Sequence, residues 1–400
     1  MRRIVTCLLL IPLSTISFQS SAQVNFSGYL KNYTIAQDEI DNGPVQLDRT
    51  FRMQNSGRFM LDAFNDNQVW QIHYEAGVDS TTELQNFGQS LFTPERNSYR
   101  LTDLQPTIGS DQRKNVLPQN LDRLNVQLQF DSGDLTIGRQ AITFGSARII
   151  NPTDVFLPFD VRTLNTEYRV GVDAVRFQKP LGQLGEVDVG VILGEDGKAE
   201  NSAGFLQVLT NAAGNDYQFT AMRFADQNLL GVGIQSALGE LGFWLEAAHV
   251  SGDDDYTRAS IGLDYAFNER VFGMVEYHFN EAGAKDPEDY FELFDDKAYT
   301  AGGVFLLGQN YLIPAVTWQA STLLGLSFQS LINLDDQSVF FSVNGDYSLS
   351  DNLYMGMGYY HFAGDDLDFF ANLPPQQQLQ LGSEYGSNPD SLYISIRYYF

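Results

Sequence analysis

The chain alternates apolar and polar residues over many short segments, and its last ten residues show this pattern most clearly. Every second position of segment 391–400 is apolar, namely Leu392, Ile394, Ile396, Tyr398 and Phe400. The positions between them hold Tyr393, Ser395, Arg397 and Tyr399. A period of two predicts a β-strand with one apolar face. Ten residues also match the length of a tilted strand that crosses a membrane.

Other segments repeat the alternation, among them 70–78, 124–130, 187–193, 259–267 and 339–349. Strands with one apolar and one polar face are what a membrane barrel with a water-filled interior requires. A soluble β-sandwich has the same period, so the strands alone leave both folds open.

The connections between these segments favour the barrel. Short turns are predicted at 65–67, 131–133, 180–182, 238–240, 268–269, 308–310 and 350–351. Longer polar connections are predicted at 37–47, 81–120, 147–169, 251–255, 283–297 and 365–389. Short and long connections mostly take turns, as in an outer-membrane barrel with periplasmic turns and extracellular loops.

The strand count must be even if both termini are periplasmic. We therefore assign 323–333 and 376–386 to loops in spite of their apolar character. The predicted fold is all-β, a transmembrane antiparallel β-barrel of about 18 strands, and counts of 16 to 20 fit the same pattern.

The first residues predict export. Arg2 and Arg3 precede an apolar run from 4 to 13, and Ser20-Ser21-Ala22 offers a cleavage site before Gln23. This is the pattern of a secretory signal peptide, whereas ten apolar residues are too few for a helical membrane anchor. The predicted organisation is a signal peptide at 1–22 and one barrel domain at 23–400. Cys7 is the only cysteine, so the mature chain has no disulfide.

The charge is strongly negative and unevenly spread. The formal net charge is −26, and without Arg2 and Arg3 the chain has 22 basic against 50 acidic residues. Segment 181–400 alone holds 7 basic and 31 acidic residues, many of them in predicted loops. These acids are either solvated loop tips or sites where divalent cations bridge to lipopolysaccharide. The acidic balance disfavours a nucleic-acid partner.

The connection 147–169 differs from the other loops because its segment 149–160 is largely apolar and contains Pro152 and Pro158. A loop of this kind can fold into the barrel, or it can pack outside on its neighbours. Folded inward, it would place charged groups at the narrowest point, where a pore selects by charge and size. The candidate constriction residues are Arg139, Arg148, Asp154, Asp160, Arg162, Arg169, Asp173 and Arg176.

Segment 138–177 resembles the core of the porin and alginate-export-like barrels. The resemblance rests on Gly138-Arg139-Gln140, Phe144-Gly145, Arg148, Asn151-Pro152, Asp154, Tyr168-Arg169, Gly171-Val172-Asp173-Ala174 and Arg176. It implies an outer-membrane channel with an arginine-lined interior. Arginines of the alginate exporters contact a polyuronate, and the resemblance gives this candidate role to Arg139, Arg148, Arg169 and Arg176. The C-terminus also resembles the assembly signal of outer-membrane barrels, carried here by Ile396, Tyr398 and Phe400.

No catalytic motif competes with a channel. The four histidines are His73, His249, His278 and His361, and Glu75 and Glu276 lie two residues from two of them. Such a pair can act as acid and base, but it is also ordinary polar lining of a lumen. We therefore expect no enzyme activity, no cofactor and no metal.

The favoured function is a porin-like channel for passive diffusion of small hydrophilic solutes, anionic ones among them. Two alternatives stay open, an exporter of an anionic polysaccharide and a structural or adhesin barrel without a channel. The expected location is the Gram-negative outer membrane. The expected partners are its lipid and lipopolysaccharide, the solutes and the barrel assembly machinery, and the sequence leaves a homo-oligomer open.

Overall fold

The computed structural model describes residues 23–42, 45–82, 99–102, 104, 107–108, 115–156, 162, 167–369 and 379–400. The predicted signal peptide at 1–22 and the candidate residue Asp160 lie outside this part of the chain.

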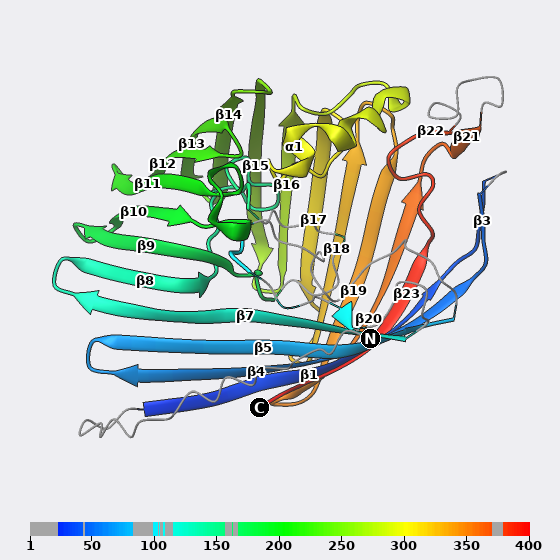
Figure 1. The fold of residues 1–400 in the computed structure, drawn as a ribbon. Helices are drawn as coiled ribbons and strands as arrows, with labels where there is room; N and C mark the ends of the chain where they lie inside the picture. The colour runs from blue at the N-terminus through cyan, green and yellow to red at the C-terminus, as the bar shows by residue number, and fades with distance from the viewer. Residues whose placement is uncertain are drawn as a thin grey trace, which may run out of the picture.

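Eighteen strands form one closed antiparallel barrel (Figure 1). They are β1 (Gln23–Gln37), β4 (Thr50–Asn65), β5 (Gln68–Thr81), β7 (Asn115–Phe130), β8 (Gly133–Gln140), β9 (Val172–Leu181), β10 (Gly185–Ile192), β11 (Ala203–Ala212), β12 (Asn215–Phe224), β13 (Gln227–Leu238), β14 (Leu241–Ser251), β15 (Tyr256–Asn268), β16 (Val271–Asn280), β17 (Asn310–Gln319), β18 (Leu324–Asn333), β19 (Val339–Ser350), β20 (Leu353–Ala363) and β23 (Ser391–Tyr399). Each strand pairs with its neighbour along the chain, and β1 pairs with β23 to close the ring. At the seam, Gly28 N donates to Phe400 O at 2.9 Å. The predicted fold class and strand number are confirmed.

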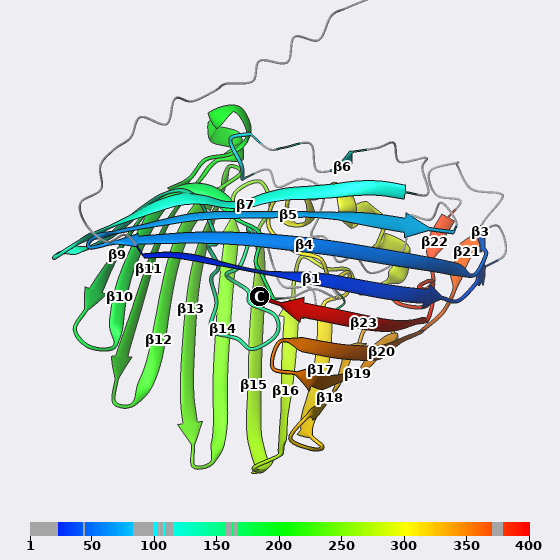
Figure 2. The ribbon, with the colours of Figure 1, turned by 90° about the horizontal axis from the view of Figure 1, so that it is seen from below.

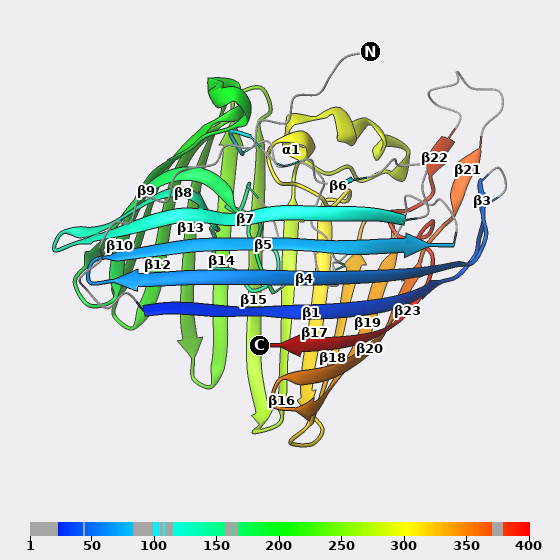
Figure 3. The ribbon, with the colours of Figure 1, turned by 60° about the horizontal axis from the view of Figure 1, so that its bottom comes forward.

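Smaller elements decorate the connections. They are the hairpins β2 (Ile40–Asn42) with β3 (Val45–Leu47) and β21 (Leu367–Phe369) with β22 (Leu379–Leu381), strand β6 (Thr107–Ile108) beside β7, the 3-10 turns η1 (Glu195–Gly197), η2 (Ala199–Asn201), η3 (Pro287–Asp289) and η4 (Glu292–Asp295), and helix α1 (Lys297–Thr300). Figure 3 shows α1 and the β21–β22 hairpin beyond the strand ends on one side of the barrel. Within the described residues, no helix is both long and apolar enough to cross a membrane.

The two ends of the barrel differ in the length of their connections (Figure 2). One end, here called the short-turn end, carries connections of two to four residues. The start of β1 and the end of β23 also lie there. The other end, here called the long-loop end, carries the connections 38–49, 82–114, 141–171, 193–202, 225–226, 252–255, 281–309, 334–338 and 364–390. The predicted alternation of short and long connections is therefore confirmed in outline.

Two sequence assignments were wrong in detail. The sequence predicts a loop at 323–333, but 324–333 is the barrel strand β18, which pairs with β17 and β19. The short turn expected at 308–310 is the end of the long connection 281–309. The true turn before β18 is 320–323, which contains no Gly, Pro, Asn or Asp, and for this reason the sequence did not reveal it.

The barrel is apolar outside and polar inside. Large apolar side chains such as Phe26, Leu30 and Trp70 are at least half exposed, while Arg58 and Glu246 are almost fully buried. A soluble sandwich buries its apolar face, so this reversed distribution agrees with a barrel that meets lipid. Ile396, Tyr398 and Phe400 belong to the exposed apolar set, with 50%, 40% and 39% exposure.

Candidate functional site

The connection 141–171 holds the main candidate site, and we call its described residues the strap. Its first half lies against the polar inner face of β14. Glu246 of this strand is fully buried and accepts hydrogen bonds from the backbone of Ser146 at 2.5 Å, Ala147 at 2.8 Å and Thr153 at 2.9 Å. Backbone N–H groups rarely stay unpaired when buried, and here a carboxylate supplies the acceptors.

A second buried carboxylate, Glu276 of β16, holds the next residues of the strap. It accepts the N–H of Ile150 at 2.8 Å and the N–H groups of Arg148 and Ile149 at 3.2 Å each. The indole N–H of Trp244 donates to the same carboxylate at 2.8 Å. The strap is thus hydrogen-bonded to the barrel wall at β14 and β16.

The second half of the strap contacts a different part of the wall. Glu167 pairs with Lys31 of β1 at 2.9 Å and accepts a hydrogen bond from the hydroxyl of Tyr399 in β23 at 2.5 Å. The ring of Tyr168 stacks on Tyr29 with 5.9 Å between centroids. Strands β14 and β16 lie far from β1 and β23 around the ring, so the described residues of the strap contact two distant parts of the inner wall.

Two of the predicted arginines are held in buried ion pairs near the strap. Arg139 is 5% exposed and makes two hydrogen bonds to Asp173, at 2.8 and 2.9 Å. Arg176 pairs with Asp188 of β10 at 2.5 Å. These groups are paired within the wall, and Arg139 has little surface to offer a solute.

Three other predicted arginines lie on the strap itself. The side chain of Arg148 is 50% exposed, with its guanidinium 3.4 Å from Asp264 and 5.6 Å from the Trp244 ring centroid. The side chain of Arg169 is 31% exposed and hydrogen-bonds to the buried Asp154 at 2.8 Å. Arg162 lies 5.9 Å from the ring of Phe305 in the long connection 281–309.

Asp154 is the buried acid of this group. Burial raises the pKa of its carboxyl to about 7, although Arg169 opposes the rise. Its Oδ2 atom faces Arg169, whereas Oδ1 has no hydrogen-bond partner among the described residues. Asp154 is therefore a carboxyl that Arg169 keeps paired inside the strap.

Sequence reasoning missed the carboxylates that organise the site. The sequence gives no signal for Glu246, and it indicates Glu276 only as an acid–base partner of His278. In the structure, Glu276 binds the strap, and His278 contacts Ser260 instead at 2.8 Å. Their places in the alternation do predict an inward direction, but no sequence pattern shows that a carboxylate will bind a distant backbone.

A second charged group was also missed. Asp122 of β7 pairs with Arg58 of β4 and, at 2.8 Å, with Arg123, and its Oδ1 accepts the N–H of Gly171 at 2.8 Å. Arg58 also lies 4.2 Å from the ring centre of Tyr168, so this cluster supports the second half of the strap.

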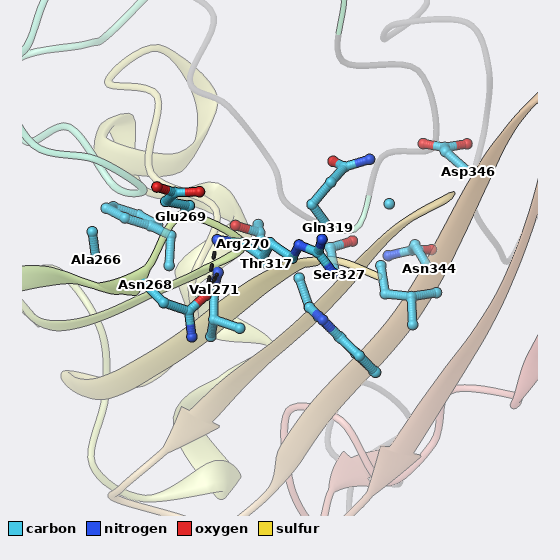
Figure 4. Close-up of a pocket in the computed structure, with 14 residues that line it drawn as sticks. Ala266, Asn268, Glu269, Arg270, Val271, Thr317, Gln319, Ser327, Asn344 and Asp346 are labelled. Atoms are coloured by element: carbon cyan, nitrogen blue, oxygen red, sulfur yellow. Dashed lines mark hydrogen bonds between the residues drawn. The ribbon is translucent and has the colours of Figure 1, made fainter. Parts of the chain in front are cut away.

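A polar cavity of about 560 Å³ opens at the short-turn end of the barrel (Figure 4). Its lining comes from β15 to β19 and the turns between them. Asn268, Gln319, Asn344 and Asp346 contribute polar groups, and the exposed Arg270 lies among them. The interior at this end is thus accessible to water. Among the described residues, no group of three His, Cys, Asp or Glu is arranged to hold a metal ion.

Known proteins resemble this chain in structure but not in sequence. No protein family matches it, and no curated protein matches it. OccAB4 of Acinetobacter baumannii has a TM-score of 0.59 at 9% identity, covering 96% of this chain and 99% of that one. OccAB1 of the same species has a TM-score of 0.57 at 10% identity, covering 96% and 99%.

OccK7 (OpdD) of Pseudomonas aeruginosa has a TM-score of 0.56 at 10% identity, covering 94% of this chain and 99% of that chain. At such identities the similarity shows the fold alone. The match extends over nearly the whole of both chains.

Proposed function

We propose that this chain is an outer-membrane channel for the passive diffusion of small hydrophilic solutes, with a preference for anions. The observation that carries the proposal is the strap, which contacts two distant parts of the inner wall and leaves Arg148 and Arg169 partly exposed. Charged groups at a narrow point select solutes by charge and size. The proteins with similar structures are outer-membrane porins, which supports the same function.

The paired arginines favour passive diffusion over polysaccharide export. An exporter of a polyuronate needs free cations along its path, because each uronate residue carries a carboxylate. Arg139 and Arg176, which the resemblance assigned to this role, have their own carboxylate partners in Asp173 and Asp188. Arg148 and Arg169 also have carboxylate partners, in Asp264 and Asp154, but their side chains are 50% and 31% exposed, and we assign to them the contact with a solute.

The same proposal places the protein in the outer membrane of a Gram-negative cell after cleavage before Gln23. Its partners there are lipid, lipopolysaccharide and the barrel assembly machinery, and we assign it no catalytic role. Further copies of the chain are also proposed as partners. The side chains of Asn32 and Asn55 hydrogen-bond to each other at 2.8 Å on the apolar outer face, where a protein neighbour could satisfy their remaining polar atoms. Native mass spectrometry in mild detergent tests both the cleavage site and the number of copies.

The channel is tested in a planar bilayer with a salt gradient. The native barrel is expected to conduct, with a reversal potential that shows a weak anion preference and fades as salt rises. Replacement of both Arg148 and Arg169 by Ala should shift the reversal potential toward cations, because the arginines stay charged at any working pH.

The control is Arg49→Ala, since Arg49 lies in the connection 38–49 and its side chain is 60% exposed beside Asp38. This substitution should leave the reversal potential unchanged. No conductance of the native protein would refute the channel, and an unchanged potential in the double variant would refute the assignment of the two arginines.

A further inference from the structure

The backbone of the strap presents a continuous row of N–H groups to two carboxylates. The amides of 146–147 donate to Glu246 at 2.5 and 2.8 Å, and those of 148–150 donate to Glu276 at 3.2, 3.2 and 2.8 Å. Successive N–H groups that converge in this way form a binding site for an anion. Here the anions are side chains of the barrel's own wall.

The neighbouring strand is shaped to receive the strap. A Cβ atom on Gly231 of β13 would lie 2.2 Å from a methyl carbon of Thr153, and one on Gly233 would lie 2.2 Å from the hydroxyl of Ser146. Two residues further along the same face, Gln235 donates to the carbonyl of Ser146 at 2.5 Å. The wall therefore offers space, a donor and acceptors where the strap lies.

The position of Arg148 depends on these contacts between the strap and the wall. Its backbone N–H donates to Glu276, and its side chain turns from there toward Asp264. Asp264 lies near the end of β15 at the short-turn end, the end where the polar cavity opens. If the strap left the wall at Glu276, the Arg148 guanidinium would leave this place with it.

We propose that Glu246 and Glu276 are the positioning residues of the channel, which fix the strap against the wall and thereby hold Arg148 in the path of the solute. The part of this inference that concerns solutes rests on the proposed channel function. The two glutamates act through the strap, because their carboxylates are fully engaged by it and by Trp244.

A carboxylate is required at these positions, since both of its oxygens accept hydrogen bonds. Glu276 uses Oε1 for Ile150 and Oε2 for Arg148, Ile149 and Trp244. A glutamine has the same shape, but its amide nitrogen would face at least one N–H donor. Glu276→Gln therefore removes acceptors without a change of volume.

The sign of the change in selectivity separates positioning from simple electrostatics. Glu276→Gln removes a negative charge, which alone would make the interior more selective for anions. If Glu276 positions Arg148, the variant should instead lose anion preference and approach Arg148→Ala. The double variant should then equal Arg148→Ala alone.

The matched control is Glu186→Gln on β10. Glu186 lies on the same strand face as the buried Asp188 and accepts a hydrogen bond from Gln178 at 3.0 Å. Glu186→Gln removes one negative charge, as Glu276→Gln does, but Glu186 makes no hydrogen bond to the strap. The control should therefore raise anion preference slightly. A shift of Glu276→Gln in the same direction as this control would overturn the proposal.

A second readout does not depend on conduction. Hydrogen exchange of the amides of 146–150 should become about tenfold faster or more in Glu246→Gln and Glu276→Gln, while amides of distant strands keep their protection. Glu276→Asp, which keeps both acceptor oxygens, should fall between the native protein and Glu276→Gln. If the native barrel does not conduct, the channel fails, but exchange still decides the anchoring. Unchanged protection in folded, heat-modifiable variants would refute it.

Discussion

At the residue scale, the interior of the barrel is organised by carboxylates that each serve several partners. Asp122 is an example, because one side chain binds Arg58, Arg123 and the backbone of Gly171. The register of β5 with β7 shifts between His73 and Tyr74, and Asp122 is the extra residue of β7 at this irregularity. A bulge turns two successive side chains toward the same face, so that an acid and a base lie together inside.

This cluster gives a stability prediction. Asp122→Ala should lower the free energy of unfolding by roughly 3 kcal/mol, because it removes the close carboxylate partner of the buried Arg58 and leaves it the more distant carboxylate of Glu75, at 3.7 Å. The measurement is urea unfolding of the barrel in detergent micelles, followed by tryptophan fluorescence. Asp216→Ala, at an exposed position at the start of β12, is the control and should stay within about 0.5 kcal/mol of the native protein. A similar effect of both substitutions would contradict the role of the cluster.

The site could be predicted only in part at this scale. Sequence reasoning brought Arg148, Asp154 and Arg169 together on one loop, and two of them do form an ion pair. It could not see that Arg139 is buried in its own pair, because pairing depends on which strands become neighbours. Nor could it find Glu246, which is remote in sequence from the backbone that it binds.

At the scale of the strand, the period of two was enough to predict most of the barrel, and the failures came from the turns. β18 was missed because the even strand count was reached by assigning 323–333 to a loop. The turn before it, 320–323, has Ser321 but no Gly, Pro, Asn or Asp. The connection 281–309 was misread for the opposite reason. It ends in Gly308-Gln309-Asn310, which looks like a tight turn, but Gly308 there packs against Asn333 and makes a bridge to Ala284. Turn composition is a local signal, whereas the end of a strand is decided by pairing.

The last strand carries an element-scale prediction. Phe400 packs against Phe26 and Phe59 on the outer face, with ring centroids 5.8 and 6.2 Å apart. Phe400→Asp should impair insertion into the outer membrane far more than Arg397→Gln, which changes an inward side chain paired with Asp346. A charge near the interface costs only about 0–1 kcal/mol of folding energy, so most of the loss would come from recognition during assembly. Heat-modifiable bands of equal intensity for the two variants would contradict this.

At the scale of the whole molecule, the long-loop end is tied together by a buried carboxyl. Glu384, in the connection 364–390, accepts hydrogen bonds from Tyr311 at 2.5 Å and Asn333 at 3.0 Å, and from the N–H of Leu307 at 3.3 Å. Asp336 accepts from the same amide nitrogen of Asn333 at 3.1 Å. Two carboxyl groups thus meet where three connections converge, and a proton shared there would relieve their repulsion.

Docking of the connections should therefore weaken as pH rises. Burial, with the charge of Asp336 adding to it, raises the pKa of Glu384 to about 7 from an ordinary value of 4.5, although Arg162 and Tyr311 oppose the rise. Between pH 4.5 and pH 7, Glu384 keeps its proton while the connection 364–390 is docked and loses it when this connection undocks. Stability of docking is thus full below pH 4.5, falls through the window and levels off above pH 7. The loss is at most roughly 3 kcal/mol, about three-hundredfold in the ratio of docked to undocked loop. The protection factor of the Leu307 amide, measured by hydrogen exchange at pH 5 and pH 8, reports this change, and Glu384→Gln should abolish it. A Glu384→Gln variant that kept the native pH dependence would exclude Glu384 as its source.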